Sequence, residues 1–398
     1  MPEAPGLSRG RPGAAAPRVV AAPNAFKGAL PAARAAEAIV LGAGDAGAGE
    51  VLAVPVADGG DGTAEVLRAA LGGSARPAAA EDPWGRVRHS AFVLLPDGSA
   101  VVDAAAASGL GRQRPDPVRA LAASTLGTGH LVRAAVQAGA RTVRVALGGS
   151  ATSDGGAGLL TALGAEVRDA AGHPLAPGGG ALAGAASVDL SGLRWLEGVR
   201  LEALVDVRSP LLGPEGAAAV FSPQKGAGPE EVQLLERGLS RWADLLEGAS
   251  GRSVRGLAGA GAAGGAGFAL ATALGAPLRP GAAFVVELLG LRRHLGPGDL
   301  VLTGEGALDG QTARGKAPAA VAAAAAAAGA TCCALTGSLG PGWEALCGKG
   351  GLAAAFPLSP GPRTRARALA ATFDDLRRTA AMVIRLFTAG RNGTAEPA

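Results

Sequence analysis

The sequence predicts an α/β protein built on parallel β-sheet, and two observations lead to this class. Short apolar runs of strand length recur along the chain, and each ends at glycine or at a polar residue. Most of these runs are followed by an alanine-rich segment of helix length. Strand, polar turn and helix repeated in this order are typical of βαβ units, which build parallel sheets.

Six apolar runs are predicted as strands. They span residues 18–23, 51–57, 142–147, 201–205, 300–303 and 331–336. The stretch from Lys316 to Ser338 has no charged residue between its ends, but Gly329 divides it into an alanine-rich half and a strand-like half. We therefore predict a helix followed by a strand there, and not a membrane span.

The section from about residue 78 to 193 has a different pattern. Ser90–Leu95 and Ala100–Ala104 alternate as paired strands do, and Pro96-Asp97-Gly98 between them predicts a tight turn. A hairpin does not belong to the βαβ rhythm of the flanking sequence. It predicts a second domain inserted into the first.

Composition limits the kind of partner. The chain has 398 residues, enough for two or three domains. Its net charge is only +4 and its aromatic content is 3%, and this low charge and low aromatic content exclude a typical nucleic-acid-binding surface. Its three cysteines lack metal-ligand spacing and predict reduced thiols in the cytoplasm. Residues 1–17 lack an apolar signal segment and are predicted to be a disordered tail. We expect a cytoplasmic protein without nucleic-acid or membrane partners; a homodimer is left open.

Acidic residues stand in glycine-lined loops after several predicted strands. They are Asp58, Asp61, Asp154, Glu305 and Asp309. Ligands of parallel sheets bind outside the carboxyl ends of the strands, and carboxylates beside loop amides and lysines are what a Mg·ATP site requires. Isolated acids after strands also cap helices, so this alternative stays open for each of them.

Two glycine motifs have simpler interpretations than their patterns suggest. Gly310–Lys316 fits a P-loop, but the next residue is Ala317 where Mg²⁺ needs Ser or Thr, so only Lys316 is kept as a phosphate contact. Gly259–Gly264 fits a dinucleotide fingerprint, but no strand precedes it. A tight turn opening the helix Gly265–Leu274 is favoured, with a nucleotide-dependent oxidoreductase as the alternative.

A third segment, Ser124–Gly129, precedes the helix-like run His130–Ala138. Small hydroxyl residues and glycine at a helix start offer backbone N–H groups to an anion. Ordinary capping of the helix explains the same residues equally well.

Taken in order, these segments resemble the bacterial glycerate kinase family of the two-domain type. The matching stretches, with residue numbers, are APNAFKG (22–28), VPVADGGDGT (54–63), DAAAASGL (103–110), STLGTG (124–129), GGSATSDGGAG (148–158), FSPQKGA (221–227), GAGAAGGAG (259–267) and TGEGALDGQTARGK (303–316). The resemblance extends from about residue 18 to 340 and more weakly to 385. Asn24-Ala25 departs from the family, which usually has Asp at the first position of this pair.

The resemblance implies a discontinuous architecture and a reaction. A flavodoxin-like parallel-sheet domain would comprise residues 18–77 and 295–388, with an inserted α/β domain over 78–294 and a tail over 389–398. The active site would lie in the cleft between the domains. ATP, with Mg²⁺, would phosphorylate D-glycerate to 2-phosphoglycerate, or else to 3-phosphoglycerate. Another small hydroxy acid as acceptor, and an anion-binding relative that lost activity through Asn24, are the alternatives.

The resemblance also suggests roles for individual residues. Lys27, Asp58, Asp154 and Asp206 are the candidate catalytic residues, with Asp154 as proton acceptor. Glu305 and Asp309 are the candidate Mg²⁺ ligands. The candidate nucleotide and substrate contacts are Asp61, Ser124, Thr125, Gly127, Thr128, Gly148, Gly149, Ser150, Gly155, Gly156, Lys225 and Lys316.

Overall fold

The computed structural model describes residues 16–111 and 113–393, which divide into two compact units. The first unit contains the described residues up to Pro55, Leu291–Ala313, and the chain from Val321. The second contains Val56–Gly290 and Arg314–Ala320. The predicted tail over 1–17 lies outside the described residues except for its last two positions.

The first unit is built on a five-stranded parallel sheet. Its strands are β1 (Val19–Ala21), β2 (Val51–Ala53), β11 (Leu300–Glu305), β12 (Thr331–Thr336) and β13 (Ala354–Pro357). Their order is β13-β12-β11-β1-β2, with every pair parallel. Numbered within the unit, this is 2-1-3-4-5, the flavodoxin-like order. The predicted class of this domain is confirmed.

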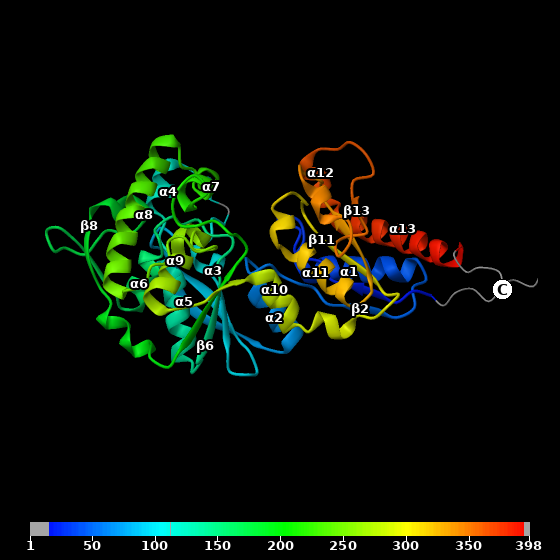
Figure 1. Cartoon of the computed structure of the whole chain (residues 1–398), viewed down its shortest axis with the longest axis horizontal. Helices are drawn as coiled ribbons and strands as arrows, with labels where there is room; N and C mark the ends of the chain where they lie inside the picture. The colour runs from blue at the N-terminus through cyan, green and yellow to red at the C-terminus, as the bar shows by residue number, and fades with distance from the viewer. Residues whose placement is uncertain (1–15, 112, 394–398) are drawn as a thin grey trace, which may run out of the picture. The chain divides into compact units, whose positions relative to one another are not determined.

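The helices α1 (Ala32–Asp45) and α13 (Thr372–Gly393) pack against this sheet. The helix α12 (Arg365–Ala370) packs on α13, and α11 (Ala317–Ala327) leads into β12. The blue α1 and the red α13 lie side by side (Figure 1), where Arg377 forms an ion pair with Asp45 at 2.6 Å. Gly42 of α1 faces the Arg377 carbonyl so closely that a side chain there would collide with it. The helix α13 continues to Gly393, so residues 389–393 are helical and not the start of a tail.

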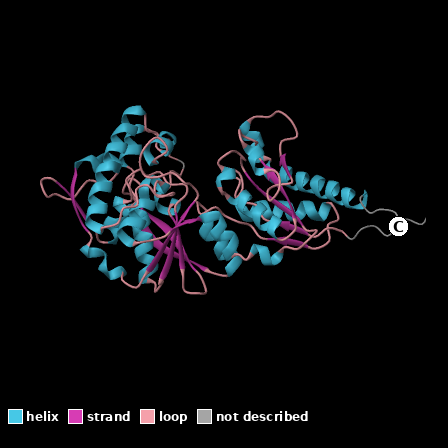
Figure 2. Ribbon diagram, viewed as in Figure 1, coloured by secondary structure: helices cyan, strands magenta, loops and turns pink. Residues whose placement is uncertain are grey.

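The second unit is built on a mixed six-stranded sheet. Its strands are β3 (Ser74–Glu81), β4 (Val87–Leu94), β5 (Ala100–Asp103), β6 (Thr142–Ala146), β9 (Arg200–Val205) and β10 (Leu278–Pro280), in the order β10-β9-β6-β5-β4-β3. The strands β3, β4 and β5 pair antiparallel, which confirms the predicted hairpin, and the rest pair parallel. This sheet is the magenta fan of the larger unit in Figure 2. A separate hairpin joins β7 (Glu166–Asp169) and β8 (Ala185–Asp189).

The boundary between the units differs from the expected one. The sequence suggested that residues up to 77 belong to the first domain. In the structure β3 pairs over its whole length with β4, and the second unit begins at Val56. The segment 56–77 therefore folds with the inserted unit.

Nine α-helices are described in the second unit. They are α2 (Thr63–Leu71), α3 (Ala105–Ser108), α4 (Pro117–Ala122), α5 (Leu126–Gln137), α6 (Ala157–Leu163), α7 (Ala217–Phe221), α8 (Pro229–Ser250), α9 (Ala262–Leu274) and α10 (Gly281–Leu288). Trp242 of α8 is fully buried, and its indole N–H donates to the carbonyl of Gly155 at 2.9 Å. The long helix thus holds the loop that leads into α6.

A helix fit to cross a bilayer is absent from residues 16–111 and 113–393. The uncharged stretch after Lys316 forms α11 and β12, as predicted.

Candidate active site

In the first unit, polar residues meet where the strand order reverses. The strands β1 and β11 are neighbours, and ligands of such sheets bind beyond the carboxyl ends of these two strands. The chain leaving β1 carries Asn24 and Lys27, and β11 ends at Glu305. The backbone N–H of Asn24 donates to the carbonyl of Gly304 at 2.9 Å. Lys27 is exposed and Glu305 is buried. The structure therefore brings these two predicted residues to one edge of the sheet.

Asn24 stands at the position where the resemblance leads one to expect an acidic residue. Its side chain is buried, and its Oδ1 accepts the backbone N–H of Ala25 at 2.8 Å. The amide oxygen thus fixes the turn after β1, a local role that a carboxylate would also fill.

The loop after β11 holds the two candidate metal ligands through one threonine. The Thr312 hydroxyl donates to Glu305 Oε1 at 2.7 Å, and the Thr312 N–H donates to Asp309 Oδ1 at 3.1 Å. In the part of the chain that the structure describes, no three His, Cys, Asp or Glu side chains form a metal cluster. Kinases usually hold Mg²⁺ with one or two carboxylates and the substrate phosphates, so the chemistry of this pair fits that ion.

A second candidate lysine, in the GxxxxGK segment, directly precedes a helix. Lys316 stands one residue before α11, and no strand ends next to Gly310, since β11 ends at Glu305. This is not the strand–loop–helix context of a P-loop.

In the second unit, two glycine loops and Asp206 come together at the carboxyl ends of β6 and β9. The N–H of Gly148 lies 3.4 Å from the carbonyl of Gly59. A Cβ on Gly148 would lie 2.5 Å from the Cα of Gly60 and 3.1 Å from Asp206 Oδ2. Only glycine allows this approach. The structure thus groups the predicted loops 58–63 and 148–150 around Asp206.

The acidic residues of this group differ in exposure. Asp58 is 3% exposed, and its Oδ1 accepts the N–H of Gly60 at 3.2 Å. Asp61 and Gly149 are exposed, whereas Ser150 and Asp206 are half-buried. Asp61 borders Gly149, because a Cβ on that glycine would lie 3.4 Å from the Cβ of Asp61. A small anionic ligand could reach the loop amides here, with carboxylates alongside.

Asp103 belongs to this group, although sequence reasoning did not select it. It ends β5, is 7% exposed, and accepts the N–H groups of Gly62 and Ala64, each at 3.0 Å. Its pKa is raised to about 7, first by burial and also by the nearby carboxylates of Asp61 and Glu65, against the effect of the two N–H donors. Its position directly after an apolar strand was the available signal.

Asp154 lies at the centre of a buried network. Its side chain is 1% exposed. Five donors converge on the carboxylate at 2.8–3.3 Å: the N–H and hydroxyl of Thr125, the hydroxyl of Ser124, and the N–H groups of Gly156 and Gly158. Burial raises its pKa, and the hydrogen bonds act in the opposite direction. A carboxylate so enclosed favours a structural role over the expected proton transfer, which requires contact with the substrate.

The predicted anion site at the start of α5 is filled from within the protein. The N–H and hydroxyl of Thr125 bind Asp154, and the Thr128 hydroxyl pairs with that of Ser108 at 2.7 Å. A Cβ on Gly127 would collide with the Glu81 carbonyl. The anion at this helix start is therefore the Asp154 carboxylate, and the two loops that the sequence singled out separately are joined by it.

Lys225 binds the backbone of the loop that carries Asp154. It is 5% exposed, and its Nζ donates to the carbonyl of Thr152 at 2.6 Å. Burial lowers its pKa to about 8, while the charge of Asp154 acts in the opposite direction. The ammonium group is thus turned to the backbone of the loop and to its buried carboxylate.

The GxGxxG segment packs behind this loop. Ala263, Gly264 and Gly265 have positive φ values of 50°, 65° and 97° at the start of α9. The N–H of Gly155 donates to the Gly264 carbonyl at 2.9 Å, and a side chain on Gly264 would collide with the Thr152 carbonyl. The segment is a tight turn opening a helix, as favoured from the sequence, and it packs against the backbone of the 152–155 loop.

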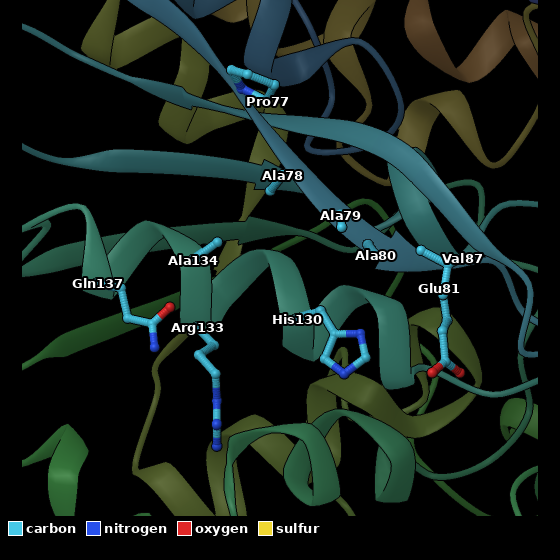
Figure 3. Close-up of a pocket in the computed structure, with 10 residues that line it drawn as sticks. All are labelled: Pro77, Ala78, Ala79, Ala80, Glu81, Val87, His130, Arg133, Ala134 and Gln137. Atoms are coloured by element: carbon cyan, nitrogen blue, oxygen red, sulfur yellow. The ribbon is translucent and has the colours of Figure 1, made fainter.

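A groove of about 500 Å³ lies elsewhere on the second unit, between β3 and α5. Ala78, Ala79 and Glu81 of β3 line one side, and His130, Arg133 and Gln137 project from successive turns of α5 on the other (Figure 3). None of the predicted site residues lines it. The candidate site is therefore the loop group at the strand ends and not this groove.

Comparison with known proteins shows the family of this chain. Residues 19–388 match the model of the glycerate kinase family. A glycerate kinase of Bacillus subtilis (strain 168) is 41% identical over 347 residues, covering 86% of this chain and 91% of the relative. A glycerate 2-kinase of Escherichia coli (strain K12) is 37% identical over 308 residues, covering 77% of this chain and 81% of the relative.

A solved structure is similar over almost the whole chain. It comes from Salmonella typhimurium LT2 and is described as a candidate glycerate kinase 2. It is 39% identical, superposes with a TM-score of 0.78, and covers 94% of this chain and 99% of its own.

Proposed function

The chain belongs to the glycerate kinase family, and we propose that it transfers the terminal phosphoryl group of ATP to the 2-hydroxyl of D-glycerate. It is thus a kinase, an ATP-dependent phosphotransferase that acts on an alcohol. The 2-position rests on the relative named glycerate 2-kinase.

One observation carries this proposal beyond the family match. In each unit, the residues predicted for phosphate chemistry converge at the carboxyl ends of the central strands. Lys27 and Glu305 do so in the first unit, and the loops 58–63 and 148–150 with Asp206 do so in the second. Phosphoryl transfer needs positioning and charge neutralisation more than covalent chemistry, and loop amides, a mobile ammonium group and carboxylates supply both.

Asp206 is the proposed acceptor of the substrate hydroxyl proton. It follows β9 directly, is half-buried, and has its Oδ2 beside the backbone of Gly60 and Gly148. Asp154 is enclosed by five donors and instead holds the 148–158 loop to the start of α5. A base must come within hydrogen-bond reach of the substrate, and the half-buried Asp206 is more accessible for this than Asp154, which is 1% exposed.

Glu305 and Asp309 are the proposed holders of Mg²⁺. When bound there, the ion would neutralise phosphate charge. Lys27 would add a point charge to the same edge of the sheet, and Asp58 and Asp61 would orient the loop amides of the second unit.

The test is ADP release by the purified protein with Mg·ATP and D-glycerate, compared with L-glycerate and with no acceptor. D-Glycerate-dependent release, with ³¹P NMR assigning the product as 2-phosphoglycerate, supports the proposal. ADP release with another hydroxy acid but not with D-glycerate would overturn the proposed substrate. A 3-phosphoglycerate product would overturn the proposed position of phosphorylation.

The variant Asp206→Asn tests the assignment of the proton acceptor. Asp206→Asn should lower kcat at least 100-fold while leaving the thermal unfolding midpoint within a few degrees of the wild type. An unchanged kcat would remove Asp206 from this role.

The cytoplasmic location of the protein stays a prediction. The homodimer also stays a prediction, and sedimentation equilibrium of the purified protein would test it.

A further inference from the structure

We propose that Asp103 is a positioning residue for the phosphoryl transfer, acting through the DGGDGT loop (residues 58–63) that it fixes. The inference rests on the proposed function. It concerns a residue outside the predicted site residues.

The geometry places Asp103 between the two glycine loops. Its own strand β5 pairs with β6, and Asp103 is the register partner of Ala146, two residues before Gly148. Its Oδ2 accepts the N–H of Gly62 and its Oδ1 accepts the N–H of Ala64. One carboxylate therefore ties the start of α2 to the strand that lies beside the 148–150 loop.

The start of α2 is capped by a side chain from a distant strand. The N-cap residue is Gly62, with φ 89°, and it has no side chain to accept a hydrogen bond. Two of the N–H groups at this helix end are instead satisfied by Asp103, 41 and 39 residues away in the sequence. Such remote capping is unnecessary for the helix alone, since a local Ser or Asp would suffice. It fixes the position of the loop relative to the sheet.

The loop so fixed contributes two predicted site residues. Asp61 precedes Gly62 directly and borders Gly149, and Asp58 binds the N–H of Gly60, which lies against Gly148. The Thr63 hydroxyl donates to the Gly60 carbonyl at 2.7 Å, which makes the turn rigid. Loosening Asp103 would therefore displace both loops, and a displacement of about 1 Å can cost about 100-fold in rate.

The surroundings make this tie sensitive to pH. The charged groups around Asp103 are Asp61 in the loop and Glu65 in the first turn of α2, both acidic, and its pKa is raised to about 7. Neighbouring α3 contributes only Ala105–Ser108, which carry no charge. Protonation turns an acceptor oxygen into a donor and weakens one of the two bonds. Activity should then rise as pH increases through about 7.

The experiment compares the full-length wild type with Asp103→Asn and with Asp116→Asn as a matched control. Asp116 likewise caps a helix of the second unit, accepting the Arg119 N–H at 2.9 Å, but lies outside the proposed site. For Asp103→Asn we expect kcat to fall 10- to 100-fold and the limb of the pH profile near 7 to disappear. For Asp116→Asn we expect kcat within about twofold and an unchanged profile.

Hydrogen exchange provides a readout that does not depend on the reaction. Peptides covering residues 59–67 should exchange faster in Asp103→Asn than in the wild type at the same pH, and not in Asp116→Asn. Unchanged exchange in these peptides, or a lowered unfolding midpoint with the wild-type kcat and pH profile, would overturn the inference. Asp103→Asn could show faster exchange while the wild type shows no glycerate-dependent ADP release. This outcome would support the link between Asp103 and the loop but reject the proposed function.

Discussion

At the scale of single residues, the buried carboxylates of the second unit organise the loops around them. Asp154 joins the starts of α5 and α6, and Asp103 joins the start of α2 to β5. In both cases a carboxylate supplies the negative charge that a helix N-terminus favours. The anions predicted to bind at the glycine-rich loops are therefore partly the protein's own carboxylates.

The enclosure of Asp154 predicts a loss of stability on neutralisation. Asp154→Asn replaces one accepting oxygen with an amide that faces existing donors, so the free energy of unfolding should fall by about 3 kcal/mol. Urea denaturation followed by circular dichroism measures this. A large fall in kcat at unchanged stability would instead return Asp154 to the role of proton acceptor.

Lys225 predicts a pH dependence of stability with a definite sign. Its pKa is lowered to about 8 from 10.5 in the unfolded chain. Between these values the unfolded state binds more protons, so this group raises the free energy of unfolding as pH increases from 8 to 10.5, and the gain is lost as pH falls through 8. In Lys225→Met this rise, up to about 3 kcal/mol, should be absent.

Urea denaturation at pH 7.5 and 10.5 checks this expectation. Lys349→Met, at an exposed position, is the control and should follow the wild type. Parallel curves for the wild type and Lys225→Met would contradict the lowered pKa.

At the scale of elements, close packing of backbone explains why the site loops are rich in glycine. Gly148→Ala would place a Cβ 2.5 Å from the Cα of Gly60. The loops must then separate, so we expect kcat/KM to fall at least tenfold and stability to fall by about 1–3 kcal/mol. Gly248→Ala, in α8 with no atom within 4 Å of the new Cβ, is the matched control. Equal kcat/KM values for Gly148→Ala and Gly248→Ala would show that the reaction does not depend on the close approach of the two loops.

The regular elements were largely predictable from the sequence, because apolar periodicity reports burial directly. All six predicted strands exist, as does the break between α11 and β12. The strand Ser74–Glu81 was not predicted, since it is mostly exposed, alanine-rich and interrupted by Pro77. Such an edge strand has no alternation of apolar residues to reveal it.

The site was predictable as a set of residues but not as a set of contacts. Residues at strand ends were found because parallel sheets place ligands there. The pairing of Thr125 with Asp154, and of Gly62 with Asp103, spans 29 and 41 positions. Capping over such separations leaves no local pattern, so Asp103 was missed and Thr125 was assigned to an external anion.

At the scale of the whole molecule, the second unit is an insertion whose two ends meet. A Cβ on Gly281 would lie 2.5 Å from the Cα of Gly59, so the segment that enters the unit touches the one that precedes its exit. Its core, which includes Leu131, Leu159 and Trp242, is formed from residues between 56 and 290.

This closure predicts that residues 56–290 fold without the rest of the chain. The fragment should unfold in one cooperative urea transition and show no kinase activity, because Lys27 and Glu305 are missing. A fragment without a cooperative transition would show that residues 314–320 or the first unit are required for its core.

The strand order of the first unit bears on how a ribosome produces this protein. The strand β1 lies inside the sheet and is synthesised early, yet its neighbour β11 follows about 280 residues later. The Thr303 hydroxyl of β11 donates to the Ala22 carbonyl, 281 residues earlier in the sequence. At about 5–20 residues per second, the wait is roughly a quarter of a minute to a minute. The inserted unit can fold during this time, while β1 has only β2 beside it in the sheet and α1 lacks α13, the helix against which it packs. We therefore expect residues 19–53 to be the segment of the nascent chain that relies most on a chaperone.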